Sequence, residues 1–285
     1  MKKTFSDLIK KLSFTKTREE EPETTREPEV VLSTLCSSSG RSIGKIRKSN
    51  QDSLFSSIFR ISDHDHDHEL GIFIVADGMG GHSNGELASE LAIKVASSVL
   101  LDLIKNAEID LGDDNVVFAA IKQAVTQSQD TIMSYGKDMG TTITLAVVID
   151  RRAYIANLGD SRCYLTNGDA LEQVTNDHSL VNRLVEIGQL TPEEAKDYPQ
   201  KNVLYKALGV TGNISPDLFS RELKPGDRLL LCSDGLWGCV NDAIIASVIT
   251  SNESLQNRVN ELIGLALKAG GPDNISCILS ELQTC

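Results

Sequence analysis

The run IFIVADG, residues 72–78, is apolar and strand-like until it ends abruptly at Asp77 and Gly78. A second run, RLLLCSDG, residues 228–235, reaches an Asp-Gly pair in the same way at Asp234. Hard divalent cations such as Mg²⁺ and Mn²⁺ prefer oxygen ligands in near-octahedral array, and Asp is the shortest carboxylate, so the backbone largely fixes its place. Two aspartates at strand ends therefore predict a shared metal site.

Two further aspartates extend this pattern. Asp273, in GGPDNIS, precedes another apolar strand-like run, and Asp52, in SNQDS, stands just before SLFSSIF. For any single Asp-Gly pair the simpler interpretation is a turn, because both residues are common in turns without any metal. The glycine-rich sequence ADGMGGHSNGE around Asp77 favours the metal site, since glycines let the backbone approach a ligand closely.

The composition is typical of one enzyme-sized domain. The chain has 285 residues, 40% of them hydrophobic, which is enough to bury a large core. A net charge of −12 argues against nucleic acid as a partner, because phosphate backbones require clustered Lys and Arg. The six cysteines show no paired metal-ligand spacing, which favours a reducing cytoplasm. No stretch approaches the roughly 18 apolar residues of a membrane span, so we expect no transmembrane segment.

The first 32 residues differ from the rest of the chain. Apolar residues recur there at helical spacing, with lysines around them, at Phe5, Leu8, Ile9 and Leu12. This amphipathic stretch would contact an acidic membrane surface or a partner, or remain a frayed tail, because isolated helices of about 12 residues are marginal in water. The polar sequence TKTREEEPETTREPEV that follows predicts a disordered linker. We expect a flexible tail over residues 1–32 and one folded domain over residues 33–285.

Beyond residue 33, strands and helices come in groups. The patterns predict strands over residues 53–60, 70–76, 141–150, 153–160, 161–166, 217–223, 228–232 and 275–282. They predict helices over residues 83–105, 116–133, 178–188, 191–197, 241–250 and 253–269. The three consecutive strands within 141–166, with tight connections, predict an antiparallel meander. Grouped rather than alternating elements indicate an α+β fold.

Other polar residues each allow two interpretations. Arg47 lies close in sequence to Asp52, and an Arg fork beside a dication suits a phosphate, although one basic residue among several also fits a solvated face. Asp160 lies between two predicted strands, and its sequence position alone indicates a turn residue. The tract DHDHDHE, residues 63–69, would hold a transition metal through its imidazoles or form an exposed strand connection.

Seven short motifs occur in the order found in one known family. They are RKSNQDS, VADGMGGHSNGE, MGTT, ANLGDSRCYL, TNDHSL, CSDGLWG and GGPDNIS. Over residues 38–283 the chain resembles metal-dependent Ser/Thr protein phosphatases of the 2C class, and bacterial members most closely. The resemblance implies a four-layer sandwich of two antiparallel β-sheets flanked by antiparallel helices. It also implies hydrolysis of phosphoserine and phosphothreonine in proteins by a metal-activated water.

The resemblance gives the aspartates specific roles. Asp77 would bridge two ions, Mn²⁺ or Mg²⁺, and the carbonyl of Gly78 would bind one of them. Asp234 and Asp273 would complete the binuclear site. Asp52 would act directly or through a coordinated water. Two such cations lower the pKa of a water and neutralise phosphoryl oxygens during in-line displacement.

Two more residues gain roles from the resemblance. Asp160 would help to hold the third ion found in many bacterial relatives, with Asp234 contributing. Arg47 is placed to hold the substrate phosphate. No phosphoenzyme is needed, because no cysteine sits in a Gly-rich phosphate loop followed by Arg, and Cys232 reads as strand packing.

The chain departs from the family pattern at a few positions. Gln51 stands where many relatives have Glu, and Lys206 stands where Arg is usual. Met79 replaces the His that is a candidate general acid in animal relatives. Protonation of the leaving group then falls to a metal-coordinated water, with His82 as the alternative.

The segment 177–201 resembles the flap that borders the active site in bacterial relatives, although a surface helix pair would look the same. We expect His178 within it to be structural. The expected partners are phosphorylated proteins, with a Ser/Thr kinase as functional counterpart, and we expect a monomer. Two alternatives stay open: a phosphatase dedicated to one regulator, and an inactive phosphoprotein-binding scaffold. Scaffolds typically lose ligand aspartates, whereas all five are present here.

Overall fold

The computed structural model describes eight stretches of the chain, namely residues 33–62, 67–80, 83–105, 113–136, 138–168, 170–196, 198–212 and 214–284. The predicted tail, residues 1–32, and residues 63–66 of the DHDHDHE tract lie outside these stretches.

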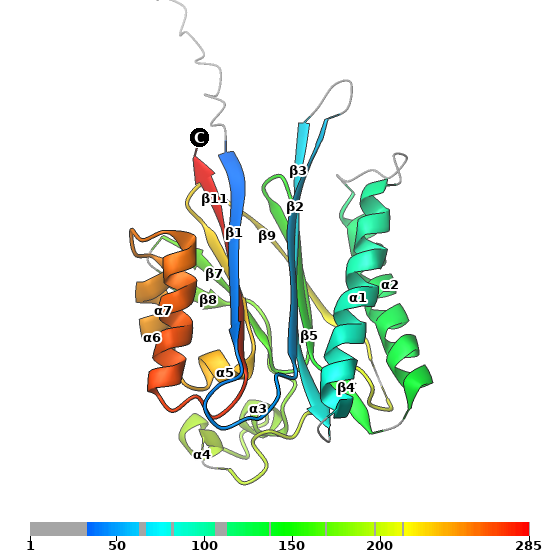
Figure 1. Ribbon diagram of the computed structural model, residues 1–285, viewed down its shortest axis with the longest axis vertical. Coiled ribbons are helices and arrows are strands. Elements are labelled where there is room, and N and C mark those ends of the chain that lie inside the picture. Colours follow the sequence, from blue (N-terminus) through cyan, green and yellow to red (C-terminus); the bar gives the residue numbers. More distant parts are fainter. Residues whose placement is uncertain are drawn as a thin grey trace, which may run out of the picture. The chain divides into compact units, whose positions relative to one another are not determined.

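Two antiparallel sheets face each other and form the centre of the domain (Figure 1). The strand order in the first sheet is β1 (Ser33–Ser42), β11 (Ile275–Thr284), β10 (Arg228–Cys232), β7 (Arg162–Asn167) and β8 (Ala170–Gln173). The order in the second is β2 (Asp52–Ser62), β3 (Asp67–Gly80), β5 (Ile143–Ile149), β6 (Arg152–Leu158) and β9 (Asp217–Glu222), with β4 (Met139–Thr141) paired to β3.

Helices cover the outer faces of both sheets. The second sheet is covered by α1 (Ser83–Lys105) and α2 (Asp114–Tyr135), and the first by α6 (Asp242–Ile249) and α7 (Leu255–Lys268) (Figure 1). Three short helices lie at the lower end of the sandwich in Figure 1, namely α3 (Leu180–Glu186), α4 (Pro192–Lys196) and α5 (Asp234–Trp237). The predicted four-layer α+β sandwich is confirmed, and α1 spans its predicted range.

The position of β3 explains the continuous apolar run that ends at Asp77. Alternate side chains of this strand pack on opposite sides of the sheet. Ile72 and Ile74 belong to the core beneath α1 and α2, whereas Phe73 and Val75 belong to the core between the two sheets. All four are fully buried. A strand buried on both faces has no polar side, so its sequence shows no alternation.

The predicted meander is wrong in its last step. Strands β5 and β6 pair as expected, but β7 pairs with β8 and β10 in the other sheet. The turn at residues 159–161 therefore carries the chain from one sheet to the other. Gly159 makes this crossing possible, because its φ is +124° and a Cβ there would lie 2.6 Å from the Thr142 side chain.

Four elements were absent from the sequence-based prediction, one of them the three-residue strand β4, of which only Thr141 fell within a predicted strand. Strand β1 has few apolar residues, yet it pairs along its whole length with β11. Strand β8 and helix α5 are only four residues long each, too short to show a period. No helix in the described part of the chain is long and apolar enough to cross a membrane.

Small residues let α1 pack closely. Ala88, Ala92 and Ala96 recur every four residues and are fully buried in the core beneath the helix. Ser128 of α2 lies 3.4 Å from the Ala92 carbonyl oxygen, so the two helices approach closely at this point. The space beside Ala92 is therefore filled by neighbouring backbone and side chains.

We predict that Ala92→Leu lowers the free energy of unfolding by about 1–3 kcal/mol, because added methyl groups overpack a filled core. Urea denaturation of the metal-free protein measures the change. Glu90→Leu on the exposed face of the same helix is the matched control and should change stability by no more than about 0.5 kcal/mol. Equal effects of the two substitutions would contradict this packing.

Candidate metal centre

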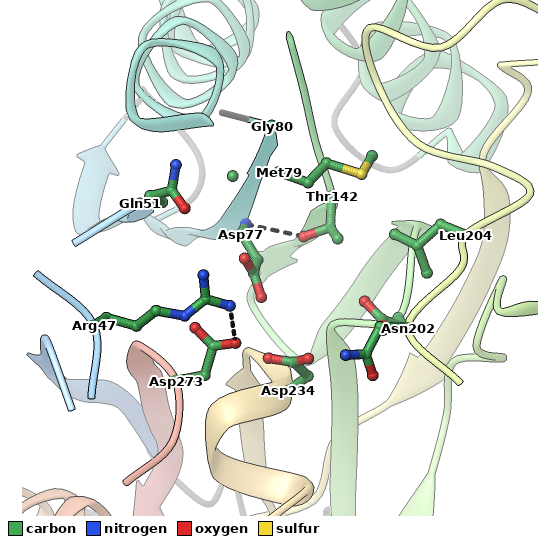
Figure 2. Close-up of a pocket in the computed structure, with 12 residues that line it drawn as sticks. Arg47, Gln51, Asp77, Met79, Gly80, Thr142, Asn202, Leu204, Asp234 and Asp273 are labelled. Carbon is green, nitrogen blue, oxygen red and sulfur yellow. Dashed lines mark hydrogen bonds and ion pairs between the residues drawn. The ribbon is translucent and has the colours of Figure 1, made fainter. Parts of the chain in front are cut away.

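A pocket opens at the end of the sandwich where several strands begin or end. Its lining residues are Arg47, Gln51, Asp77, Gly78, Met79, Gly80, Thr142, Asp160, Asn202, Leu204, Asp234 and Asp273. Figure 2 shows the side chains of Asp77, Asp234 and Asp273 around one central space. Six of the residues selected from the sequence thus meet in one place: the three aspartates just named, with Arg47, Gly78 and Asp160.

The strand register brings the aspartates together. Asp52 opens β2 and pairs with Asp77 of the antiparallel neighbour β3. Strand β10 ends just before Asp234, and its antiparallel neighbour β11 begins just after Asp273. In an antiparallel pair the end of one strand lies beside the start of the next. Each sheet therefore supplies two aspartates to the same end of the sandwich.

The glycine of each Asp-Gly pair is required by a close backbone approach. A Cβ on Gly78 would lie 2.1 Å from the Gly85 carbonyl oxygen. A Cβ on Gly235 would lie 1.9 Å from the Asn274 carbonyl oxygen. Real side chains do not tolerate such distances, so both pairs need glycine for packing. The turn interpretation of Asp-Gly is thus incomplete, because these glycines let other segments reach the site.

Hydrogen bonds fix the backbone at Asp77. Its N–H donates to Thr142 Oγ1 at 3.0 Å, and its carbonyl oxygen accepts from the Thr142 N–H at 2.9 Å. The same carbonyl also accepts from Thr141 Oγ1 at 2.9 Å. The Gly78 N–H donates to the Gln51 carbonyl oxygen at 3.0 Å. Four hydrogen bonds therefore hold the Asp77–Gly78 peptide to its neighbours, with the Asp77 carboxylate facing the pocket (Figure 2).

Asp52 lies behind the pocket surface. It is buried and accepts a hydrogen bond from Ser233 Oγ at 2.8 Å through Oδ2, whereas its Oδ1 has no partner. Oδ1 of Asp234 is also buried without a partner. A buried oxygen without a partner is costly, and a cation would satisfy it. The two unpartnered oxygens therefore fit a site for hard cations.

The pKa values of the buried aspartates reflect the crowding of negative charge in the pocket. Burial, with repulsion from the other carboxylates, raises the pKa of Asp52 to about 7, of Asp160 to about 8 and of Asp234 to about 6. The pKa of Asp77 is raised well above its ordinary value for the same reasons. Carboxylates crowded in a low-dielectric pocket cannot all ionise without a compensating charge. Divalent cations would supply that charge.

Arg47 pairs with one of the predicted ligands. Its Nη2 donates to Asp273 Oδ2 at 2.6 Å, and the Arg47 side chain is half exposed at the rim (Figure 2). The hydrogen bond that Arg47 donates to Asp273, opposed by burial, raises the pKa of the Arg47 guanidinium. Among the described residues, no group of three His, Cys, Asp or Glu side chains is already arranged to hold an ion.

Asp160 reaches the pocket from the crossing between β6 and β7. Its carbonyl oxygen accepts a hydrogen bond from Trp237 Nε1 at 3.0 Å, so helix α5, which begins at Asp234, is joined to this crossing. The guanidinium of Arg162 also stacks over the Trp237 ring, with Arg162 Cζ 3.6 Å from the ring centroid. Arg162 in turn makes a bidentate ion pair with Asp177, in which Nε donates to Oδ1 at 3.0 Å and Nη2 donates to Oδ2 at 2.7 Å. These contacts fix Asp160 relative to Asp234.

Some pocket residues were not selected from the sequence. Thr142, Asn202 and Leu204 line the site without belonging to an acidic or glycine-rich pattern. The motif MGTT was the only sequence pattern that included Thr142. Asn202 and Leu204 lie just beyond the predicted flap, residues 177–201, in a stretch with no regular period. His82, the alternative proton donor, lies outside the described residues.

Comparisons with known proteins place the chain among enzymes of one kind. A family model described as protein phosphatase 2C matches residues 40–279. The serine/threonine phosphatase Stp of Listeria innocua is 36% identical over 241 residues, which cover 84% of this chain and 92% of that protein. The structure of the serine/threonine phosphatase Stp1 from Staphylococcus aureus has a TM-score of 0.75 and 32% identity, and the match covers 90% of this chain and 98% of that one.

A further similar structure holds metal. It is the catalytic domain of the serine/threonine protein phosphatase PstP in complex with two manganese ions. Its TM-score is 0.71 at 31% identity, and the match covers 88% of this chain and all of that one.

We predict that the metal-free protein loses stability as the pH rises from 5 to 8. The folded-state pKa values of Asp234, Asp52 and Asp160 are raised, so the folded protein binds more protons than the unfolded chain in this range. Urea denaturation in chelator should show the decline, and excess Mn²⁺ at pH 8 should reverse it. Asp77→Asn should raise metal-free stability at pH 8 by about 1 kcal/mol or more.

Asp130→Asn is the control for this prediction, because it makes the same chemical change at an exposed position of α2. It should leave the pH dependence unchanged. A metal-free protein whose stability stayed constant or increased from pH 5 to pH 8 would contradict the crowding of carboxylates.

Proposed function

This chain belongs to the protein phosphatase 2C family, and we propose that it hydrolyses phosphoserine and phosphothreonine in proteins in a metal-dependent reaction. The observation that carries the proposal is the convergence of strand-end aspartates from both sheets on one pocket beside Arg47. Hydrolysis of a phosphate monoester requires binding of a dianion and activation of water. A cluster of carboxylates cannot bind a phosphate unless cations lie between them.

The proposed ligands are the residues at the centre of the pocket. Asp77, Asp234 and Asp273, with the carbonyl oxygen of Gly78, would hold two ions, and Asp52 would contribute directly or through a water. When bound, two divalent cations supply Lewis acidity, which activates water and offsets charge on the phosphoryl oxygens. We propose Mn²⁺ or Mg²⁺, because these hard ions prefer an all-oxygen donor set. The two manganese ions held by PstP support Mn²⁺.

A third ion is proposed between Asp160 and Asp234. Both carboxylates line the pocket, and the Trp237 hydrogen bond joins the elements that carry them. Burial, followed by repulsion from Asp234, raises the pKa of Asp160, and a cation held by both carboxylates would relieve this repulsion.

Arg47 is proposed to bind the substrate phosphate. Its guanidinium carries several donors in a planar fork that matches phosphate oxygens. In the described structure it is bound to Asp273, and binding of a cation by Asp273 would free it for phosphate. The pairing of Arg47 with a ligand thus supports an order in which metal precedes substrate.

Direct attack by water is favoured over a covalent phosphoenzyme. Cys232, the cysteine nearest in sequence to the site, is fully buried, and burial raises the pKa of its thiol well above the ordinary value. A nucleophilic cysteine requires the opposite, a lowered pKa and access to substrate. Met79 lines the pocket, but its side chain has no acidic proton to donate. Protonation of the leaving group is therefore assigned to water, with His82 as the alternative.

The wider biological role is also a proposal. Phosphorylated proteins would be the substrates, a Ser/Thr kinase the functional counterpart, and the cytoplasm the compartment, with the chain acting as a monomer. The catalytic domain would occupy residues 33–285, and residues 1–32 would form a tail that reaches a membrane surface or a partner. A narrower alternative is a phosphatase dedicated to one regulatory phosphoprotein.

We predict that purified protein releases phosphate from a phosphothreonine peptide with Mn²⁺ or Mg²⁺, and that chelation abolishes the reaction. Asp234→Asn should reduce turnover about 100-fold or more, because bound cations supply several kcal/mol of transition-state stabilisation. Asp130→Asn, with the same loss of one charge at an exposed site, should retain full activity.

Two outcomes would contradict the proposal. Turnover that persists after chelation and in Asp234→Asn would exclude the aspartate cluster as the active centre. A folded protein that binds phosphoproteins but hydrolyses none of them, with either metal, would favour the scaffold alternative.

A further inference from the structure

A long segment between β8 and β9 forms one wall of the pocket. From the structure we define the flap as residues 179–196 and 198–205, in place of the predicted range 177–201. Asn202 and Leu204 of the flap line the pocket, whereas Val203 and Tyr205, which alternate with them along the chain, are about half exposed. Figure 2 shows Asn202 and Leu204 on the side of the site opposite Arg47, with Asp77 and Asp234 between. The flap thus borders the side of the pocket away from the proposed phosphate-binding arginine.

The two ends of the flap are joined by backbone hydrogen bonds. The Leu180 N–H donates to the Val203 carbonyl oxygen at 2.8 Å. The Tyr205 N–H donates to the carbonyl oxygen of His178 at 3.0 Å. The segment therefore leaves and returns at one place, and whatever holds this place fixes the base of the flap.

One carboxylate holds both sides of that base. His178, which precedes the flap, places Nε2 3.1 Å from Asp217 Oδ2, without the alignment of a full hydrogen bond. Lys206, which follows the flap, places Nζ 3.0 Å from Asp217 Oδ1 and donates to it. Burial raises the pKa of Asp217, but the contacts with Lys206 and His178 outweigh it, so the pKa is lowered. The negatively charged Asp217 carboxylate thus contacts both His178 and Lys206, which are 28 positions apart in the sequence.

The same histidine also holds the crossing that carries Asp160. The Gly159 N–H donates to His178 Nδ1 at 3.1 Å, and the His178 N–H donates to the Gly159 carbonyl oxygen at 2.9 Å. Because Nδ1 accepts, the ring proton is on Nε2, which faces Asp217. His178 is fully buried, with a side-chain exposure of 1%. Asp217 therefore orients the imidazole that joins the flap to the metal-binding end of the sheet.

We propose that Asp217 is a positioning residue, which clasps His178 and Lys206 at the base of the flap and so places Asn202 and Leu204 for a protein substrate. The inference rests on the proposed phosphatase function. A small aryl phosphate needs only the aspartate cluster and Arg47, whereas a phosphopeptide also extends along the pocket walls. Loss of the clasp therefore weakens peptide hydrolysis more than hydrolysis of the small ester.

The kinetic test compares Asp217→Ala with Glu172→Gln. The control breaks a different ion pair of β9, the strand that carries Asp217. In this pair, Arg221 of β9 lies 2.6 Å from Glu172 of β8. For Asp217→Ala, kcat/KM for a phosphothreonine peptide should fall about fivefold, mainly through KM, while para-nitrophenyl phosphate changes less than about twofold. Glu172→Gln should change neither. Lys206→Arg keeps the cation and should behave like the wild type, whereas Lys206→Met should reproduce the loss.

Hydrogen exchange tests the clasp without turnover. Asp217→Ala should raise amide exchange in residues 180–204 and leave β2 and β3 unchanged, while Glu172→Gln raises neither. Unchanged flap exchange in Asp217→Ala and Lys206→Met would overturn the clasp. Equal losses for peptide and aryl phosphate would overturn the role in substrate placement. A wild-type protein without turnover would contradict the proposed function instead, and the exchange data would still decide whether Asp217 holds the flap.

Discussion

The crowding of carboxylates in one pocket is the constraint on which the rest of the structure depends. Asp52, Asp77, Asp160 and Asp234 are all buried deeply enough for their pKa values to be raised. Such an arrangement opposes folding of the metal-free chain, because each buried charge loses hydration and repels the others. It persists because the backbones that carry the aspartates are fixed by two sheets whose cores are filled independently of the site.

The sandwich supplies that rigidity through strand ends. Antiparallel neighbours in each sheet bring one strand end beside one strand start, and the facing sheets bring the two pairs to one end of the sandwich, where three of the four aspartates line the pocket. Glycines at 78 and 235 allow other segments to approach within backbone contact. The Trp237 and His178 contacts then hold the crossing with Asp160 against α5 and the flap. Chemistry is thus placed on rigid elements, while substrate contacts come from loops.

The sequence predicted an α+β fold and the strand-end aspartates because their signals are local, whereas the sandwich followed from the resemblance to a family. A continuous apolar run ending at Asp77 marks a strand buried on both faces and its end, and seven ordered motifs give the family. The crossing of β7 to the other sheet was not predicted, because a tight turn has the same sequence pattern whether its two strands pair with each other or enter different sheets. The Arg47–Asp273 ion pair and the Asp217 clasp join residues far apart in sequence, so no local pattern contains them. The metal roles of the individual aspartates stay predictions.

Calorimetric titration of the metal-free protein with Mn²⁺ at pH 7.5 tests the central claim most directly. The account predicts at least two ions bound per chain, and a loss of this binding in Asp77→Asn, whose carboxylate faces the middle of the pocket (Figure 2). Asp130→Asn should bind like the wild type. A wild-type protein that binds no Mn²⁺, or an Asp77→Asn variant with unchanged stoichiometry and affinity, would contradict a metal centre built on these aspartates.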